Sequence, residues 1–241
     1  MTISVTAVVA AFGIAVRDLT RPTVLWQALW PPLVAFGLWL TVAISFWTQG
    51  VAAVTELLPV VPWSAGEWIA RWAAAFLLLA ALASLTYATA MLLVAVFALP
   101  RLINLVALRD YPELGRHGQN VFWGSLGNTL SASAIFLLGW LLTLPLLLVP
   151  GVVLVMPLLW AAWLNQRTFR FDALAEHATR AELRLLVTQQ KSAFYLTGAG
   201  SAVLAHVPLI NLLAPAFTAL VFVHLGLAAL RRQRQLNGIQ L

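Results

Sequence analysis

The sequence predicts an all-α integral membrane protein with two long transmembrane helices and two re-entrant helical hairpins, which penetrate the bilayer only halfway. Hydrophobic residues make up 62% of the 241 residues and charged residues only 9%, so water cannot be the solvent for most of the surface. Apolar stretches of about 18 residues or more are typical of bilayer-spanning helices. Two such stretches, 24–47 and 72–99, carry no charge, and we expect the whole chain, 1–241, to form one membrane domain.

The positions of the basic residues predict the topology. The chain carries 14 Lys and Arg against 8 Asp and Glu, a formal net charge of +6. In a soluble protein this excess would suggest nucleic acid as a partner, but here it distinguishes the two sides of a membrane. The loop over 48–70 has no basic residue and contains Glu56 and Glu67. By the positive-inside rule this loop is extracytoplasmic and both termini are cytoplasmic, and we expect no nucleic-acid partner.

The N-terminal part of the chain is expected to hold an interfacial helix and the first span. Residues 1–21 have apolar positions at helical spacing, which is typical of a helix that lies at the membrane surface, with Arg17 and Arg21 toward the headgroups. The first transmembrane helix is expected over 24–48. Within this range the span itself is expected to begin near Leu29, so that Pro31 falls in its first turn, where proline is tolerated.

The second transmembrane helix is expected over 68–108 and is unusually long. Only Pro100 interrupts it, and at ~1.5 Å per residue it exceeds the ~30 Å hydrocarbon core. Its far end should therefore extend into the cytoplasm. Asn104, at this inner end, either lines an inner vestibule or lies at the headgroup level.

The second half of the chain repeats one pattern, in which a valine-proline pair and a second proline enclose six residues. Apolar arms of about 15 residues flank each copy and reach only ~22 Å. The first proline ends the entering helix and the second starts the returning one. We expect two cytoplasm-facing hairpins, over 121–169 and over 192–234 with the basic tail, while two complete spans joined by a short outer turn would satisfy the same charges. The predicted hairpin tips contain Pro150, Pro157, Pro208, Asn211 and Pro215.

A cytoplasmic amphipathic helix is expected between the hairpins, over 172–190. Asp172 is the predicted N-cap, and Glu176 and Arg180 have the spacing of an i,i+4 ion pair. In the second hairpin, the small residues Gly198, Gly200 and Ser201 are explained better by close helix packing than by ligand contact.

Several of these features together resemble the CysZ-type sulfate permease family, which shares its domain with the etoposide-induced membrane proteins. The similarity lies in HVPLINLLAPAFTAL at 206–220, LLVPGVVLVMPLLWAAWL at 147–164, the pair Phe171-Asp172, and Arg21-Pro22 ahead of the first span. It covers nearly the whole chain. The proline-leucine-x-asparagine-x-x-x-proline core of the first of these segments is its most specific part.

The resemblance implies a homo-oligomer in a bacterial inner (plasma) membrane that takes up sulfate for cysteine synthesis. It also implies two long helices and two partly penetrating hairpins. One departure concerns the substrate: sulfate-handling members carry a glycine and then an arginine pair before the proline of the first span, whereas this chain has Thr23 and then Leu25-Trp26. The cationic anchor is missing from its expected place, and Arg17 and Arg21 are the candidates to replace it.

An anion could also be bound without any formal charge. Broken helices place half-helix N-termini at membrane depth, where free N–H groups and the helix dipole attract anions, and the starts near Pro31, Pro157 and Pro215 are candidates. Asn211 either lines the path or satisfies carbonyl groups freed by the proline break. The predicted anion-binding residues are Arg17, Arg21, Thr23 and Pro31.

Catalysis and cofactor binding find little support in the sequence. The chain has no cysteine, and no phosphate-binding loop or catalytic triad spacing is apparent, so we expect no enzyme, no cofactor and no metal site. His206 and His224 lack a third ligand nearby. No charged side chain lies deep in an apolar stretch, so coupled transport is not indicated. Besides the lipid bilayer, the expected partner is a small inorganic anion, most simply sulfate, carried by a permease or channel; the alternative is a non-transporting scaffold or regulatory protein of the same fold.

Overall fold

The computed structural model describes residues 5–58, 66–118, 121–207, 211 and 213–238, and every regular element among them is a helix. The chain divides into a larger unit, residues 1–27 with 99–241, and a smaller unit, residues 28–98. Four helical segments among the described residues are long and apolar enough to cross a membrane. The predicted all-α membrane fold is therefore confirmed.

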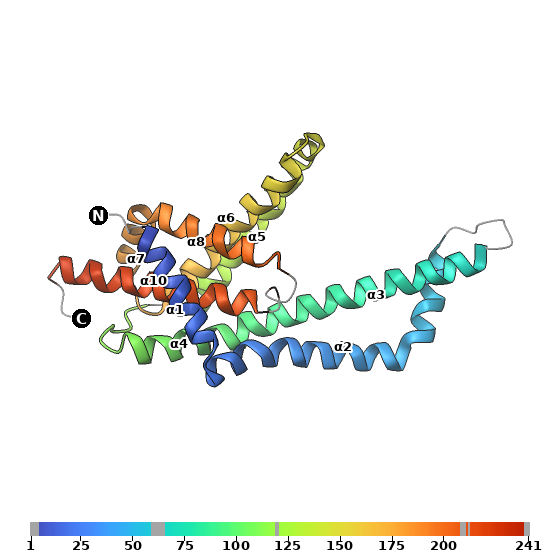
Figure 1. Ribbon diagram of the computed structural model, residues 1–241, viewed down its shortest axis with the longest axis horizontal. Helices are drawn as coiled ribbons and strands as arrows, with labels where there is room; N and C mark the ends of the chain where they lie inside the picture. The colour runs from blue at the N-terminus through green and yellow to red at the C-terminus, as the bar shows by residue number, and fades with distance from the viewer. Residues whose placement is uncertain (1–4, 59–65, 119–120, 208–210, 212, 239–241) are drawn as a thin grey trace. The chain divides into compact units, whose positions relative to one another are not determined.

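The smaller unit consists of two long antiparallel helices. It contains most of α2 (Pro22–Leu57), all of α3 (Gly66–Leu93) and the π-helical turn η1 (Val94–Ala98). Within this unit, α2 and α3 run beside each other (Figure 1). The indole nitrogen of Trp39 donates a hydrogen bond of 2.9 Å to Thr89 Oγ1, and the Trp30 and Phe97 rings are 6.4 Å apart. A polar bond and a ring contact thus hold two otherwise apolar helices in register.

Pro100 does not end the long second helix. The π-helical turn η1 comes directly before α4 (Leu99–Asp110), and the helix continues through Pro100. A proline ring clashes with the carbonyl group four residues earlier in a regular α-helix. The wider π turn at Val94–Ala98 relieves this clash, as single π turns commonly do.

Two of the prolines that were predicted to start helices lie inside them. The helix α2 already begins at Pro22, so Pro31 is in its interior, and Pro157 lies inside α6 (Val152–Ala175). Proline favours the first helical position, which Pro22 occupies, and Gly151 has a φ of 87°, which lets the chain turn just before α6. The prediction of half-helix starts at these two sites is wrong.

The core of the larger unit is α10 (Ala214–Leu236), which packs against five other helices. Large side chains such as Phe222 and Leu220 are almost completely buried on it. Pro215 is the second residue of α10, as predicted, whereas Pro208 lies outside the described residues. Its main neighbours are α1 (Val5–Leu19), α4, α6 and α8 (Lys191–Leu204), and α7 (Arg180–Gln189) makes a smaller contact with it.

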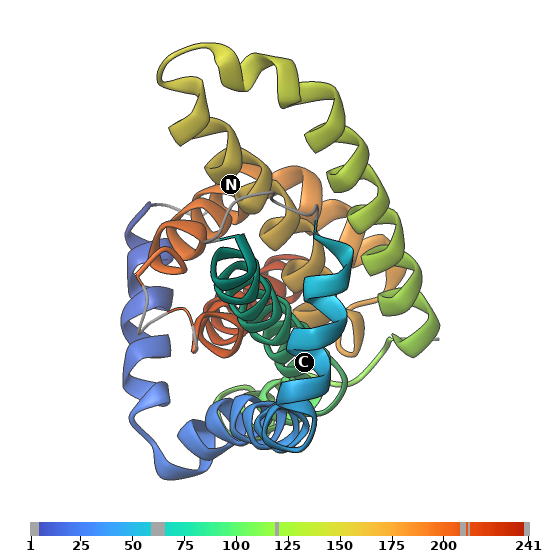
Figure 2. The same ribbon diagram turned by 90° about the vertical axis from the view of Figure 1, so that its right-hand side faces the viewer.

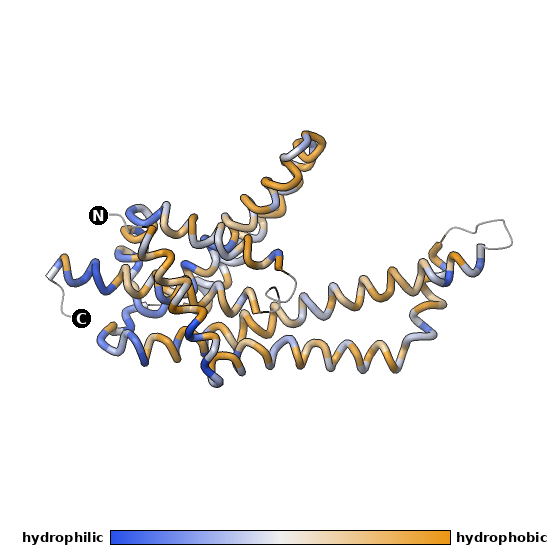
Figure 3. Tube along the Cα trace, viewed as in Figure 1, coloured by the Kyte–Doolittle hydropathy of each residue, from blue (hydrophilic) through white to orange (hydrophobic). Residues whose placement is uncertain are grey.

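The first predicted hairpin is formed by α5 (Val121–Thr143), the 3₁₀ turn η2 (Leu144–Leu148) and α6. It projects from the rest of the larger unit in both views (Figure 1, Figure 2). Its outer part is apolar along its length, whereas α10 becomes hydrophilic toward its C-terminal end (Figure 3). Leu142, Leu148 and Leu154 are more than three-quarters exposed, so this hairpin offers its apolar surface to lipid or to another protein.

The predicted helix over 172–190 is two elements in the structure. The helix α6 continues through Asp172 to Ala175, and α7 (Arg180–Gln189) follows after a short break. Asp172 is therefore not an N-cap. Thr179 caps α7 instead, in a capping box in which Glu182 bonds back to the Thr179 backbone, so two donors of the helix end are satisfied at once.

Close packing explains the glycines of the second hairpin. A Cβ atom at Gly198 would overlap the carbonyl oxygen of Ala162 on α6, and one at Gly200 would lie 2.8 Å from the ring of Phe12 on α1. Ser201 is 1% exposed. The structure confirms the packing interpretation of this small-residue cluster.

Candidate functional site

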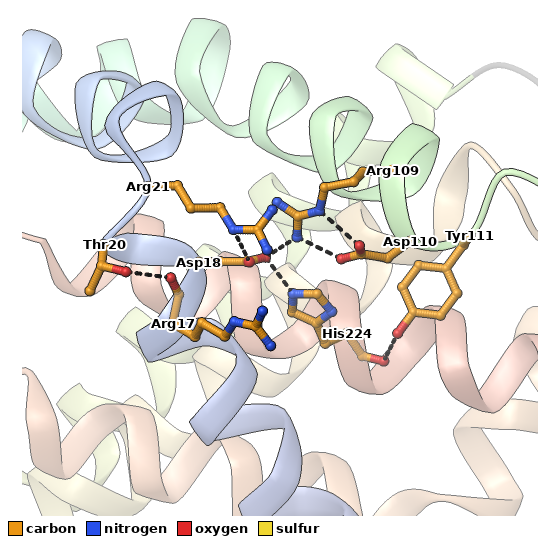
Figure 4. Close-up of polar contacts among 8 residues, drawn as sticks. All are labelled: Arg17, Asp18, Thr20, Arg21, Arg109, Asp110, Tyr111 and His224. Atoms are coloured by element: carbon orange, nitrogen blue, oxygen red, sulfur yellow. Dashed lines mark hydrogen bonds and ion pairs between the residues drawn. The ribbon is translucent and has the colours of Figure 1, made fainter.

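A buried carboxylate joins three helices of the larger unit. Asp18, at the end of α1, is 1% exposed and accepts an ion-pair contact of 2.5 Å from Arg109 Nη2 on α4. Arg21 Nε lies 3.2 Å from it, and His224 Nε2, on the buried face of α10, lies 2.9 Å from it. Figure 4 shows the three nitrogen-bearing side chains converging on the Asp18 carboxylate. The fold therefore places a buried ion pair where the sequence analysis expected none.

Two further residues complete this Asp18 cluster. Arg109 also pairs with Asp110 at 2.6 Å, so its guanidinium bridges two carboxylates. The Tyr111 hydroxyl donates to the backbone carbonyl of His224 at 3.2 Å (Figure 4). Burial raises the pKa of Tyr111 to about 12, so the phenol stays a neutral donor.

Asp18, Asp110 and His224 have the composition of a metal site. One potential ligand atom from each lies within 4.8 Å of the others. The Arg109 guanidinium, however, already donates to both carboxylates. A cation there would have to displace a fixed positive charge, so these residues fit an ion-pair network and do not fit a metal ion.

The predicted anion-binding residues have different surroundings. Arg21 is held by Asp18, which already neutralises it. Arg17 is exposed and makes no ion pair with the described residues, and Thr23 is exposed in the first turn of α2. Pro31 is inside α2 in the smaller unit. The structure brings Arg21 to the Asp18 cluster but does not form a free cationic anchor from it.

Asn104 belongs to a polar group at the end of α4. Arg116 Nη2 donates to Asn104 Oδ1 at 2.8 Å, and Arg116 Nη1 pairs with Glu176 at 2.9 Å. At the tips, Pro150 lies in the turn before α6, and the Asn211 backbone N–H donates to the Val207 carbonyl at 2.8 Å. The part of the path-lining prediction that concerns Pro208 falls outside the described residues.

A second buried cation is centred on Arg234, near the end of α10. It is 1% exposed and donates to Glu182 at 2.8 Å and to the His177 carbonyl at 2.8 Å. Burial tends to raise the pKa of Glu182, but hydrogen bonds from Arg234 and Thr179 outweigh it and lower the pKa to about 2. Burial lowers the pKa of His177. These contacts fasten α7 to α10.

Arg167 and Arg170, on α6, form the third group of cations. Both are half-buried, and no carboxylate of the described residues pairs with either. The Arg167 guanidinium lies 5.5 Å from the centre of the Trp163 ring, and that of Arg170 lies 5.7 Å from the centre of the Phe194 ring. They differ in this from Arg109 and Arg234, which are neutralised.

Sequence reasoning missed most of these residues for a simple reason. Asp18 and His224 are 206 positions apart, and no local pattern connects them. The capping box at Thr179 and Glu182 was readable from its threonine-x-x-glutamate spacing. Arg167 and Arg170 were visible as basic flanks of a hairpin, but their lack of acidic partners emerges only in the fold.

Comparison with known proteins identifies one family. The model of the family described as Sulfate transporter CysZ/Etoposide-induced protein 2.4 matches residues 11–215. No curated protein and no solved structure matches significantly. The matched region includes the C-terminal part of α1, both predicted transmembrane helices and both proline-bounded tips. The chain therefore belongs to the CysZ/etoposide-induced protein 2.4 family.

Proposed function

We propose that the protein is a permease or channel for a small inorganic anion, with sulfate as its substrate, and that it serves sulfur assimilation. The observation that carries the proposal is the family match over residues 11–215, whose description names a sulfate transporter. The four membrane-compatible helical segments agree with it. The half-buried arginines without carboxylate partners in the larger unit agree with it too, because a pathway for anions needs positive charge that is not already neutralised.

The proposal also covers the membrane location and the oligomeric state of the protein. The family match supports a bacterial inner membrane. Both termini lie in the cytoplasm, because the basic residues gather near the N-terminus, over 101–116, over 167–191 and in the tail, whereas the loop over 48–70 has none. The protein forms homo-oligomers, in which the exposed apolar face of the first hairpin packs against a second copy. The tips around Pro150, Asn211 and Pro215 line the path together with Pro157, and Asn104 lies at its inner vestibule.

A second candidate is a non-transporting scaffold or regulatory protein. Two observations favour it: Leu25-Trp26 replaces the expected arginine pair, and Arg21, the nearest substitute, is neutralised by Asp18. A scaffold with this fold would need no free cation. The two functions therefore differ in whether anions cross the membrane.

The test is uptake of radiolabelled sulfate into proteoliposomes. Transport above the level of empty liposomes, reduced by excess sulfite or phosphate but less by chloride, is the expected result. Asn211→Ala tests whether the tip of the second hairpin contributes to sulfate flux. Arg21→Ala tests whether an arginine that is already neutralised by Asp18 contributes to it. Flux at the level of empty liposomes for every anion would reject transport and favour the scaffold.

A further inference from the structure

Every carboxylate side chain of the larger unit already has a partner. Its described residues include six acidic side chains, and none of them contacts Arg167 or Arg170. Their partners are Arg109 for Asp18 and Asp110, Arg231 for Glu113, Ser125 for Asp172, Arg116 for Glu176 and Arg234 for Glu182. Neither of the two α6 arginines therefore forms an ion pair with a described carboxylate of this unit.

The surroundings of the two arginines offer few hydrogen-bond acceptors. Gln166, which is 4% exposed, accepts from Arg170 Nη1 at 2.7 Å. The aromatic faces of Trp163 and Phe194 cover the two guanidinium groups. A cation–π contact offsets part of the free-energy cost of removing a guanidinium from water. The aromatic ring offers no acceptor, however, to the N–H groups that point outward in the plane of the guanidinium.

Both arginines have an unused donor. The Nε atoms of Arg167 and Arg170 are buried and have no hydrogen-bond partner. Buried donors are normally satisfied, so an unsatisfied one in a native structure calls for a partner that is absent from it. Burial, together with the neighbouring Arg167 cation, lowers the pKa of Arg170 to about 10, which is the direction that an anion bound between them would reverse.

We infer that Arg167 and Arg170 form a binding site for a tetrahedral oxyanion, sulfate or a phosphate group, at the base of the two hairpins. Each guanidinium presents its Nε–H and an Nη–H as a fork, which matches two oxygens of such an anion. Gln166 holds Arg170 in position through its side-chain oxygen. The inference rests on the proposed function for the choice of sulfate as the dissolved ligand.

The neighbouring surface leaves two sources for the oxyanion. A groove of about 700 Å³ between α6 and α8 is lined almost wholly by apolar groups, and Trp163 and Tyr195 belong to its wall. An acyl chain in this groove would bring a lipid phosphate to the arginine above Trp163. Dissolved sulfate, which has no acyl chain, would be bound by the two guanidinium groups without the groove. The chemistry at the arginines is the same in both cases, so the experiment must separate the sources.

The test compares two double variants of the purified full chain in detergent. In Arg167→Gln/Arg170→Gln, sulfate binding measured by calorimetry should weaken at least about tenfold, because charge-assisted hydrogen bonds are lost at both residues. The matched control is Arg180→Gln/Arg184→Gln, which removes the same charge from exposed arginines of α7 that pair with no described carboxylate. The control should bind sulfate within about twofold of the wild type, since exposed and screened charges contribute little.

Two further measurements keep the result interpretable. Arg167→Lys/Arg170→Lys retains the charges but not the forks, and it should bind sulfate more weakly than the wild type at an unchanged melting temperature. For the lipid source, native mass spectrometry with phosphatidylglycerol against phosphatidylcholine should show retention by the wild type and loss in Arg167→Gln/Arg170→Gln. Lipid retention without sulfate binding would keep the oxyanion site and assign it to lipid.

The outcomes separate this inference from the proposed function. Sulfate and lipid binding that are equal in the wild type and in all variants would overturn the arginine site, whatever the flux assay shows. Binding that depends on Arg167 and Arg170 in a protein without sulfate flux would keep the site and reject transport. Flux with binding that depends only on Arg180 and Arg184 would keep transport and overturn the inference.

Discussion

The two hairpins share one sequence pattern but occupy opposite environments in the larger unit. In the most apolar window of α5 and η2, only 6% of the residues are buried, against 89% in that of α10. Near the base of the first hairpin, Asn128 and Ser125 join α5 to α6, and α6 packs against α8 and α10. The second contributes its returning arm to the centre of the helix bundle. A proline-bounded hairpin is therefore a local motif, and the surrounding helices decide whether it becomes core or surface.

Polar residues on the returning arms account for much of this difference. The helix α10 carries His224 and Arg234, and both find partners on other helices at nearly zero exposure. Such buried polar contacts are directional, so they fix one packing arrangement for α10. The outer parts of α5 and α6 have only apolar side chains and the Trp160–Thr143 hydrogen bond between them. These contacts join α5 to α6, and α6 itself also lines the groove against α8.

The largest expected effect comes from opening the Asp18 cluster. Asp18→Ala should destabilise the protein by about 3 kcal/mol or more, because it leaves buried donors without their carboxylate. Asn128→Ala, which removes a hydrogen bond at the base of the first hairpin, should cost only ~1 kcal/mol. Thermal unfolding in detergent, followed by size-exclusion chromatography, measures both. Equal shifts of the melting temperature would contradict the contrast between the hairpins.

Two glycine-to-alanine substitutions should differ in their effect on the free energy of unfolding. Gly198→Ala forces α8 away from the Ala162 carbonyl on α6 and should cost ~1–3 kcal/mol. Gly127→Ala on α5 meets no atom within 4 Å and should be neutral or stabilise by up to ~1 kcal/mol through helix propensity. The same unfolding assay applies. A stable Gly198→Ala variant would mean that α6 and α8 are not in close contact.

The acidic limb of the pH–stability profile should distinguish Glu182 from Asp172. The pKa of Glu182 is lowered to about 2 from its ordinary 4.5, so its contribution is present above about pH 4.5 and is lost as the pH falls through about 2. Glu182→Gln should therefore remove stability at neutral pH and flatten the profile below pH 4.5. The measurement is the melting temperature as a function of pH.

Asp172, at the base of the first hairpin, should behave in the opposite way. Burial raises its pKa, against the opposing effect of the Ser125 hydrogen bond, so its contribution is present below its ordinary pKa of 3.8 and is lost as the pH rises through the raised value. Asp172→Asn should raise the melting temperature at neutral pH. A loss of stability there would contradict this assignment.

The smallest expected effect concerns cysteine labelling at the tips of the two hairpins. Beyond the level of Asn128 and Arg167, which are joined by a 3.1 Å hydrogen bond, the first hairpin extends by about 15 residues to Val152, or ~22 Å of helix. The chain has no cysteine, so Val153→Cys and Asn211→Cys are clean probes. Both should stay unreactive toward a membrane-impermeant maleimide added from the periplasmic side, whereas Leu57→Cys should react. Reaction at either tip would show that this hairpin crosses completely.

Sequence reasoning was most accurate where a single residue restricts the backbone. Pro215 near the start of α10 and the close packing at Gly198 follow from proline and glycine chemistry. It was less accurate where two residues compete for the same role, as with Pro22 and Pro31, because either can lie at a helix start. Asp172 was read as a cap since its short side chain favours that position, but burial inside α6 overrode this preference.

The candidate site was less predictable than the fold. Arg21 was identified from its position, and Asp18 lies only three residues before it, but the contacts of Asp18 with Arg109 and His224 exist only in the fold. Arg167 and Arg170 needed the positions of every carboxylate in the larger unit before their isolation became visible. Long-range charge pairing is a property of tertiary structure, and an isolated sequence contains no periodicity that reports it.

The Asp18–His224 contact also sets an order for biosynthesis. At ~5–20 residues per second, the ribosome adds the 206 residues that separate this pair in roughly 10–40 s. During that interval Asp18 has only Arg21, three residues away, and later Arg109 as partners. The helix α1 therefore lacks its contact with α10 until the last helix has been made. A chain released before His224 is made leaves the first helix without its packing partner, so completion of the bundle itself distinguishes finished molecules from truncated ones.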